Sequence, residues 1–193
     1  MNVVSHFEAE LGEMSRGWGS STVEGVSVGL FEATPFEDCC TLATIGLSLD
    51  ALTMRGSNRG VRQELVCVAA REGDLELHAR MLLYVAETLS RSNQALLRGD
   101  AFPLPGGIHG RERLLAAPPG YWSDGFAVLG ETDPATVVVQ LIPIDDREAA
   151  FITEHGVDAF LSLLEESQVD LTDPNRCSVV RGGTEPGSTS PLS

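Results

Sequence analysis

The chain has 193 residues, of which 42% are hydrophobic and 21% are charged; these values are ordinary for a globular protein and exclude disorder throughout. Its formal net charge of -15 disfavours nucleic acids and anionic membranes as partners, because like charges repel, and it favours a basic protein. All 13 basic residues are arginine, which a GC-rich coding bias explains better than a function does.

The first part of the chain predicts one helix and three strands. Residues 6–14 have the spacing of a short helix, with Phe7 and Leu11 four residues apart on one side, and the glycine-containing residues 16–21 then break the pattern. Apolar runs separated by turn-forming segments predict strands at residues 26–33, 40–49 and 63–69. Successive strands that no helix separates usually pair antiparallel.

The middle of the chain predicts a long helix and then a long loop. Residues 75–91 have the clearest helical periodicity, with apolar positions three and four residues apart. His78 lies in this apolar stripe; it could be a ligand, but a hydrogen-bonded core histidine is the favoured interpretation. Residues 97–125 contain many prolines and glycines and predict an irregular loop, which in compact proteins is often functional or mobile.

The last part predicts two strands, at residues 126–130 and 136–144, and two helices. The second strand ends at Pro143, and the next two residues, Asp145 and Asp146, stand where a helix would begin. These acids could form a carboxylate pair for metal or acid–base chemistry, but capping of the helix amides is favoured.

Gly156 is expected to end the first of these helices through a left-handed backbone conformation. The preceding Glu154 and His155 resemble at most half of a zinc-protease motif. A second helix is expected to present Val157, Phe160, Leu161 and Leu164 as its apolar face. We expect one domain over residues 1–180 and a disordered tail at residues 181–193, whose Gly, Ser, Thr and Pro residues cannot build a core.

The cysteines and the N-terminus indicate a reducing environment. No two of the four cysteines have the spacing of a C-x-x-C motif, so we expect no metal site and no cofactor. The cysteines are Cys39, Cys40, Cys67 and Cys177. The chain does not open with the basic and apolar segments of a signal peptide, and no run reaches the roughly 18 apolar residues that span a bilayer. We therefore expect a cytoplasmic protein with reduced thiols.

Candidate partner-binding residues are aromatic and polar side chains in predicted loops. Tyr121, Trp122 and Asp124 form one group, because loop aromatics offer large contact areas, although Trp122 could instead cover an edge of the core. Trp18 has the same two interpretations. His109 lies in a glycine-rich loop that lacks the lysine of a phosphate-binding loop; it is either an acid–base group or an ordinary loop histidine.

The ordered landmarks resemble the bacterial branch of the suppressor of fused family over about residues 26–180. The resemblance is carried by residues 41–48 (TLATIGLS), 63–65 (QEL), 141–144 (LIPI), Glu148, 154–156 (EHG) and 173–180 (DPNRCSVV). It implies an α+β fold, with a mixed, largely antiparallel sheet and flanking helices. It also assigns a structural role to Pro143, Glu148, Gly156, Asp173, Pro174 and Arg176.

The resemblance further implies a protein-binding role without catalysis. Many bacterial relatives of the family look like immunity proteins, which neutralise a polymorphic toxin by direct binding; the net charge favours a basic toxin domain as partner. We expect the chain to lack the additional C-terminal domain of the animal form. Two alternatives stay open: a regulatory or scaffold protein that sequesters an endogenous partner, and a hydrolase that uses His109. Residues 173–176 also predict a turn, from which Arg176 could bind a carboxylate through two hydrogen bonds.

Overall fold

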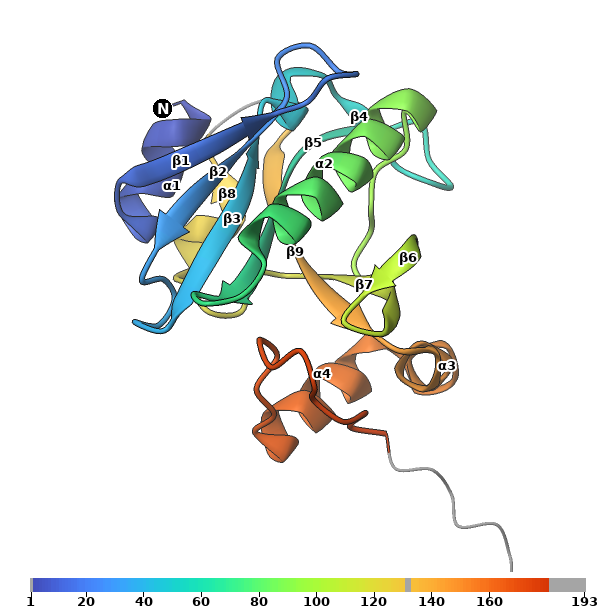
Figure 1. Cartoon of the computed structure of the whole chain (residues 1–193). Helices are drawn as coiled ribbons and strands as arrows, with labels where there is room; N and C mark the ends of the chain where they lie inside the picture. The colour runs from blue at the N-terminus through green and yellow to red at the C-terminus, as the bar shows by residue number, and fades with distance from the viewer. Residues whose placement is uncertain (1, 131–132, 181–193) are drawn as a thin grey trace, which may run out of the picture.

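The computed structural model describes residues 2–130 and 133–180, and this part of the chain forms a mixed sheet flanked by helices (Figure 1). The strands are β1 (Met14–Gly19), β2 (Ser27–Glu32), β3 (Cys39–Ile45), β4 (Leu52–Thr53), β5 (Gly60–Ala70), β6 (Ala101–Ile108), β7 (Arg111–Ala117), β8 (Val128–Leu129) and β9 (Thr136–Ile144). The α-helices are α1 (Val3–Leu11), α2 (Leu75–Ser92), α3 (Asp146–His155) and α4 (Val157–Ser167), and the 3-10 turns are η1 (Leu47–Leu49) and η2 (Asp124–Ala127).

The sheet has the order β1-β2-β3-β5-β9-β7-β6, with β4 added beside β5 and β8 beside β9. These strands pair antiparallel except for β5 and β9, which are parallel. The α+β fold with a largely antiparallel sheet is therefore confirmed. None of the helices in the described ranges is both long enough and apolar enough to cross a bilayer.

The two faces of the sheet are covered differently (Figure 1). On one face α2 packs its stripe of Leu82, Val85 and Leu89 onto the strands, and all three side chains are buried. On the other face two separate groups of elements supply the cover. One contains α1 and η2, which bury Phe7 and Phe126 against the β2–β3–β5 half of the sheet; the other contains α3 and α4, which pack against β7 and β9.

Several predicted elements are confirmed with small shifts. The helix predicted at residues 75–91 is α2, and the strand predicted at residues 136–144 is β9. The N-terminal helix begins earlier than predicted, at Val3, because the side chain of Asn2 accepts a hydrogen bond from the Ser5 amide and caps the first turn. His78 is a buried core residue whose Nδ1 lies 2.8 Å from the carbonyl oxygen of Asp74.

Two predictions of irregular structure were wrong, and both concern the edges of the sheet. The predicted break at residues 16–21 overlaps β1, which pairs only with β2 and is mostly exposed, so it has no alternating apolar pattern. The predicted loop at residues 97–125 contains β6 and β7. Pro103 and Pro105 are compatible with β6 because it is the other edge strand, where a missing amide costs no ladder hydrogen bond on the open side.

Two predicted strands are shorter than expected. The strand at residues 40–49 ends at Ile45, because Gly46 turns the chain with a φ of 98° and η1 follows. Any side chain at Gly46 would clash with the backbone oxygen of Gly25, so the turn requires glycine. The strand at residues 126–130 is reduced to β8, since its first residues belong to η2. The predicted tail at residues 181–193 lies outside the described residues.

Candidate functional site

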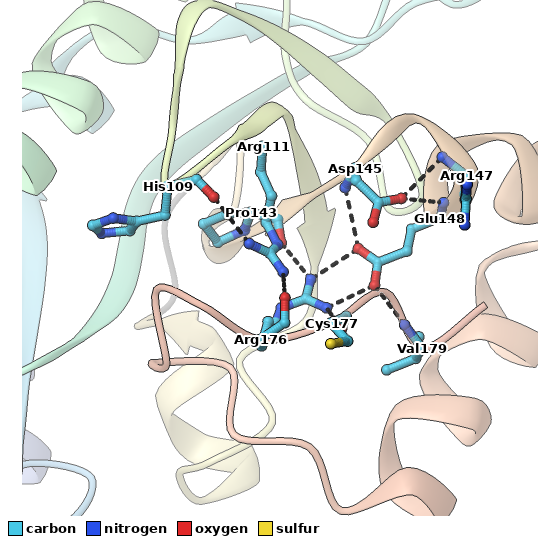
Figure 2. Close-up of polar contacts among 9 residues, drawn as sticks. All are labelled: His109, Arg111, Pro143, Asp145, Arg147, Glu148, Arg176, Cys177 and Val179. Carbon is cyan, nitrogen blue, oxygen red and sulfur yellow. Dashed lines mark hydrogen bonds and ion pairs between the residues drawn. The ribbon is translucent and has the colours of Figure 1, made fainter. Parts of the chain in front are cut away.

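A buried ion pair joins the C-terminal segment to the start of α3 (Figure 2). The Nη1 and Nη2 atoms of Arg176 donate to Oε1 and Oε2 of Glu148 at 2.6 and 2.8 Å, and both side chains are almost fully buried. Arg176 Nη2 also donates to the carbonyl oxygen of Pro143 at 2.7 Å, and the amide of Val179 donates to Glu148. The prediction that Arg176 binds a carboxylate in two places is confirmed, and the carboxylate is that of Glu148.

Local sequence holds Glu148 in position for this pair (Figure 2). Asp145 caps α3 by accepting hydrogen bonds from the amides of Arg147 and Glu148, and the Glu148 carboxylate accepts one from the Asp145 amide. The capping interpretation of Asp145 therefore holds. Asp146, exposed, forms an ion pair with Arg113 at 2.8 Å.

The other residues of the predicted structural motif shape the same region. Gly156 has a φ of 86° and separates α3 from α4. The carboxylate of Asp173 accepts a hydrogen bond from the Asn175 amide, so the turn at Asp173 and Pro174 is present and delivers Arg176 to Glu148. Arg111 donates to the backbone oxygens of His109 and Arg176, which ties β7 to this turn.

A second internal contact is centred on Glu64, at the heart of the sheet. Its carboxylate has no exposed surface and accepts hydrogen bonds from the hydroxyls of Thr44 and Ser48 and from the amides of Gly46 and Ser48, at 2.6–3.1 Å. Burial raises the pKa of Glu64, and these hydrogen bonds oppose the rise. The contact holds the turn from β3 into η1.

Gln63 makes the third internal contact. Its side-chain amide donates to the carbonyl oxygen of Leu96 at 2.7 Å and accepts from the Leu96 amide at 3.0 Å, so it pairs like one residue of a strand ladder. Gln63 is 2% exposed, and the pair ties the segment that follows α2 to the core. We call the contacts of Glu148 with Arg176, of Glu64 and of Gln63 the internal locks. Their polar groups are enclosed and bonded within the chain, so they stabilise the fold and do not reach a partner.

An open groove lies on the face of the sheet that has two separate covers. Its floor is formed by Gln140 and Ile142 of β9 and Ala117 of β7. One wall is the loop of Pro118, Gly120 and Tyr121 before η2; the other is α4 with the segment after it, through Leu161, Leu164, Glu165, Gln168, Val169 and Leu171. The groove has a volume of about 370 Å³ and a mainly apolar lining. We call it the α4 groove.

The structure divides the predicted aromatic site between surface and core. Tyr121 is 37% exposed at the rim of the α4 groove, and its ring packs edge-on against Phe36, which is 56% exposed. Trp122 is half-buried: its ring centroid lies 4.7 Å from that of Phe126, and its Nε1 donates to the hydroxyl of Thr34 at 3.4 Å. Asp124 is exposed at the start of η2.

The other two predicted partner-binding residues lie elsewhere. Trp18 belongs to the edge strand β1, where it packs against the α2 side of the core and the guanidinium of Arg16 lies 4.7 Å above its ring. His109 lies at the turn between β6 and β7, with its ring centroid 5.5 Å from that of His78. Burial, together with the nearby His109, lowers the pKa of His78. Of the five predicted partner-binding residues, Tyr121 lines the α4 groove, whereas Trp122, Asp124, Trp18 and His109 do not.

Among the described residues, no three His, Cys, Asp or Glu side chains are placed so that they could hold a metal ion. The four cysteines are free thiols. Burial and the neighbouring Asp38 raise the pKa of Cys39 to about 11, so this thiol is protonated near neutral pH and is a poor nucleophile.

Sequence reasoning missed Phe36 and the groove wall at residues 161–171. Phe36 follows a Thr-Pro turn, so an exposed aromatic in a predicted loop was the available signal for it. The wall offered no such signal, because Leu161 and Leu164 also read as the ordinary apolar face of a helix.

The fold and these sites define a class of α+β proteins. Internal polar contacts stabilise a mixed sheet, and one face of the sheet carries an open groove. A family model for the suppressor of fused protein (SUFU) matches residues 19–177, and the chain belongs to this family. The resemblance inferred from the sequence is thereby confirmed.

Individual relatives agree with this assignment. The chain is 24% identical to Immunity protein YqcF of Bacillus subtilis (strain 168) over 172 residues, which cover 87% of this chain and 88% of the relative. A suppressor of fused homologue from Neisseria gonorrhoeae FA 1090 superposes with a TM-score of 0.69 at 18% identity, covering 93% of this chain and 96% of that one. A chain of the Sufu-Fu complex gives 0.66 at 13% identity, covering 92% and 90%. These structures share the fold.

Proposed function

We propose that the protein is a cytoplasmic immunity protein, which neutralises a basic toxin by binding it directly and without turnover. The proposal is supported by the likeness over nearly the whole chain to a relative named as an immunity protein. The observation that carries it is the surplus of unpaired acids on the surface. Glu165, Glu166 and Asp170 form no ion pair within the described ranges, and neither does Asp124 at the start of η2.

Such a surface favours association with a cationic protein. With a net charge of -15, the protein attracts a basic partner from a distance and raises the rate of encounter. A toxin that cleaves nucleic acid is the kind of partner with a basic surface to offer, and covering that surface would block its substrate. Binding alone would then be sufficient for protection.

The test pairs the full chain with the C-terminal domain of a toxin-like protein from a neighbouring gene, which is called the toxin domain below. We expect titration calorimetry to show a tight complex whose affinity falls as sodium chloride is raised, because salt screens the attraction. Coexpression should restore growth of cells that produce the toxin domain. Absence of a complex, or an affinity that does not respond to salt, would contradict the proposal.

A further inference from the structure

The α4 groove has the composition of a site for a short protein segment. Ile142, Leu161, Leu164, Val169 and Leu171 supply apolar surface between the sheet and α4. Its volume of about 370 Å³ lies near the lower end of the usual range for binding pockets, which suits a few inserted side chains. An open apolar groove with one aromatic at its rim is a common docking surface for a partner's anchor residues.

A polar group at the floor of the groove is left without a partner. Gln140 is 4% exposed, and its Oε1 accepts a hydrogen bond from the Gly120 amide at 3.1 Å. This bond identifies the oxygen end of the side-chain amide, so the Nε2 end is the donor. Within residues 2–130 and 133–180 this Nε2 has no hydrogen-bond partner, and Gln140 lines the groove. The Nε2 atom borders the open groove, where it can donate to an incoming carbonyl oxygen.

The charges around the groove have a single sign. Glu165 lies in the wall, and Asp170 lies between the two lining residues Val169 and Leu171. Burial and the nearby carboxylate of Asp170 raise the pKa of Tyr121, which places that charge close to the rim. No arginine lines the groove. An occupant that carries arginine or lysine beside its apolar residues therefore matches both the lining and the rim.

We infer that the α4 groove docks a segment of the basic partner, which inserts apolar side chains over Ile142 and Leu164. Flanking arginine or lysine side chains of the segment lie against Glu165 and Asp170. A backbone carbonyl of the segment accepts the hydrogen bond that Gln140 Nε2 offers. The inference rests on the proposed function for the identity of the partner, and it adds the surface and the chemistry of the segment.

The groove can be tested without the toxin, with three synthetic peptides and isotope-labelled full-length protein. The matched peptide is acetyl-RRLLRR-amide; acetyl-RRGGRR-amide keeps the charge, and acetyl-SSLLSS-amide keeps the apolar pair. We expect the matched peptide to shift the resonances of Tyr121, Leu161 and Leu164, and to move the side-chain NH2 signal of Gln140 downfield. Each control peptide should bind at least about tenfold more weakly, because it lacks one half of the recognition.

Two charge-reversal variants localise the effect. Glu165→Arg changes the groove wall, and Glu24→Arg makes the same change on an exposed residue of the loop between β1 and β2. That loop lies at the end of the sheet away from α4 (Figure 1). We expect Glu165→Arg to weaken the matched peptide about tenfold and Glu24→Arg less than about twofold. Both residues are exposed, so both variants should fold.

Four outcomes would overturn the inference. Peptide shifts that map outside the groove would do so, and so would equal losses in the two variants. Sedimentation that shows self-association abolished by Glu165→Arg would assign the groove to a second copy of the chain. If the toxin domain binds with unchanged affinity to Glu165→Arg, the proposed function stands and the groove assignment fails. If the peptide docks but no toxin complex forms, the reverse is true.

Discussion

The internal locks and the α4 groove use similar residue types for opposite purposes. In the locks, Glu148 and Gln63 direct their polar atoms at other parts of the same chain, and each is almost completely enclosed. In the groove, Glu165 forms no ion pair and Gln140 Nε2 no hydrogen bond with any residue that the structure describes, and both side chains border open space. The segments that carry the family resemblance contain the lock residues Gln63, Glu64, Glu148 and Arg176. Family membership therefore reports how the chain folds, and we propose that the choice of partner depends on the α4 groove.

The sharpest test of this division is the buried ion pair. Glu148→Ala should lower the free energy of unfolding by about 3–5 kcal/mol, because it leaves the guanidinium of Arg176 buried without its carboxylate. Urea unfolding followed by circular dichroism measures the loss. Asp146→Ala is the matched control, since its ion pair with Arg113 is exposed and should contribute less than about 1 kcal/mol. If both variants lost a similar amount of unfolding free energy, the buried ion pair would not differ from an exposed one in its contribution to stability.

Removal of the Gln63 lock should have the next largest effect. Gln63→Ala leaves both the amide and the carbonyl of Leu96 buried without a partner, and we expect a loss of about 2–4 kcal/mol in the free energy of unfolding. Hydrogen exchange should increase at Leu96 and its neighbours after α2. Under conditions where the variant is folded, its affinity for the toxin domain should equal that of the wild type. A loss of affinity in the folded variant would place this lock in the binding surface.

The groove should behave in the opposite way. Tyr121→Ala removes an exposed ring that contacts Phe36, so the free energy of unfolding should fall by less than about 1 kcal/mol. The affinity for the toxin domain should fall by about 2 kcal/mol, as expected for an aromatic contact residue at an interface. Calorimetry and urea unfolding of the same preparation compare the two values. If stability changes more than affinity, Tyr121 belongs with the structural residues.

The smallest expected effect is a pH dependence from Glu64. Its pKa is raised above the ordinary value of 4.5 by burial, so the folded state holds this proton more tightly than the unfolded chain does. The resulting stabilisation is complete below the unfolded pKa and is lost as the pH rises through the folded pKa. Glu64→Gln cannot lose a proton, so the stability of the wild type relative to this variant should decrease as the pH rises from the ordinary pKa of 4.5 through the raised pKa of the folded state. A difference that stays constant over this range would show that the hydrogen bonds to Glu64 cancel the effect of burial.

Much of the fold followed from local patterns in the sequence. The helical period of residues 75–91 and the β-branched run of residues 136–144 are strong signals, and both elements form where they were expected. Asp145 and Gly156 mark the ends of α3 through capping and backbone conformation, which act within one turn of helix. The sequence also indicated the two-pronged hydrogen bonding of Arg176, because that geometry belongs to the guanidinium itself.

Only the tertiary structure decided which elements form the sheet edges and where an open surface remains. The strands β1 and β6 lack an alternating pattern, since each pairs on one side only, and pairing with a distant neighbour is what makes them strands. Glu148 pairs with Arg176, which is 28 positions later in the sequence. Tyr121 lines the α4 groove together with side chains from residues 161–171. The physical reason is that such contacts depend on how the helices pack onto the sheet. No local sequence pattern encodes this packing. The same packing decided that Trp122 lies largely against the core while Tyr121 stays at the surface.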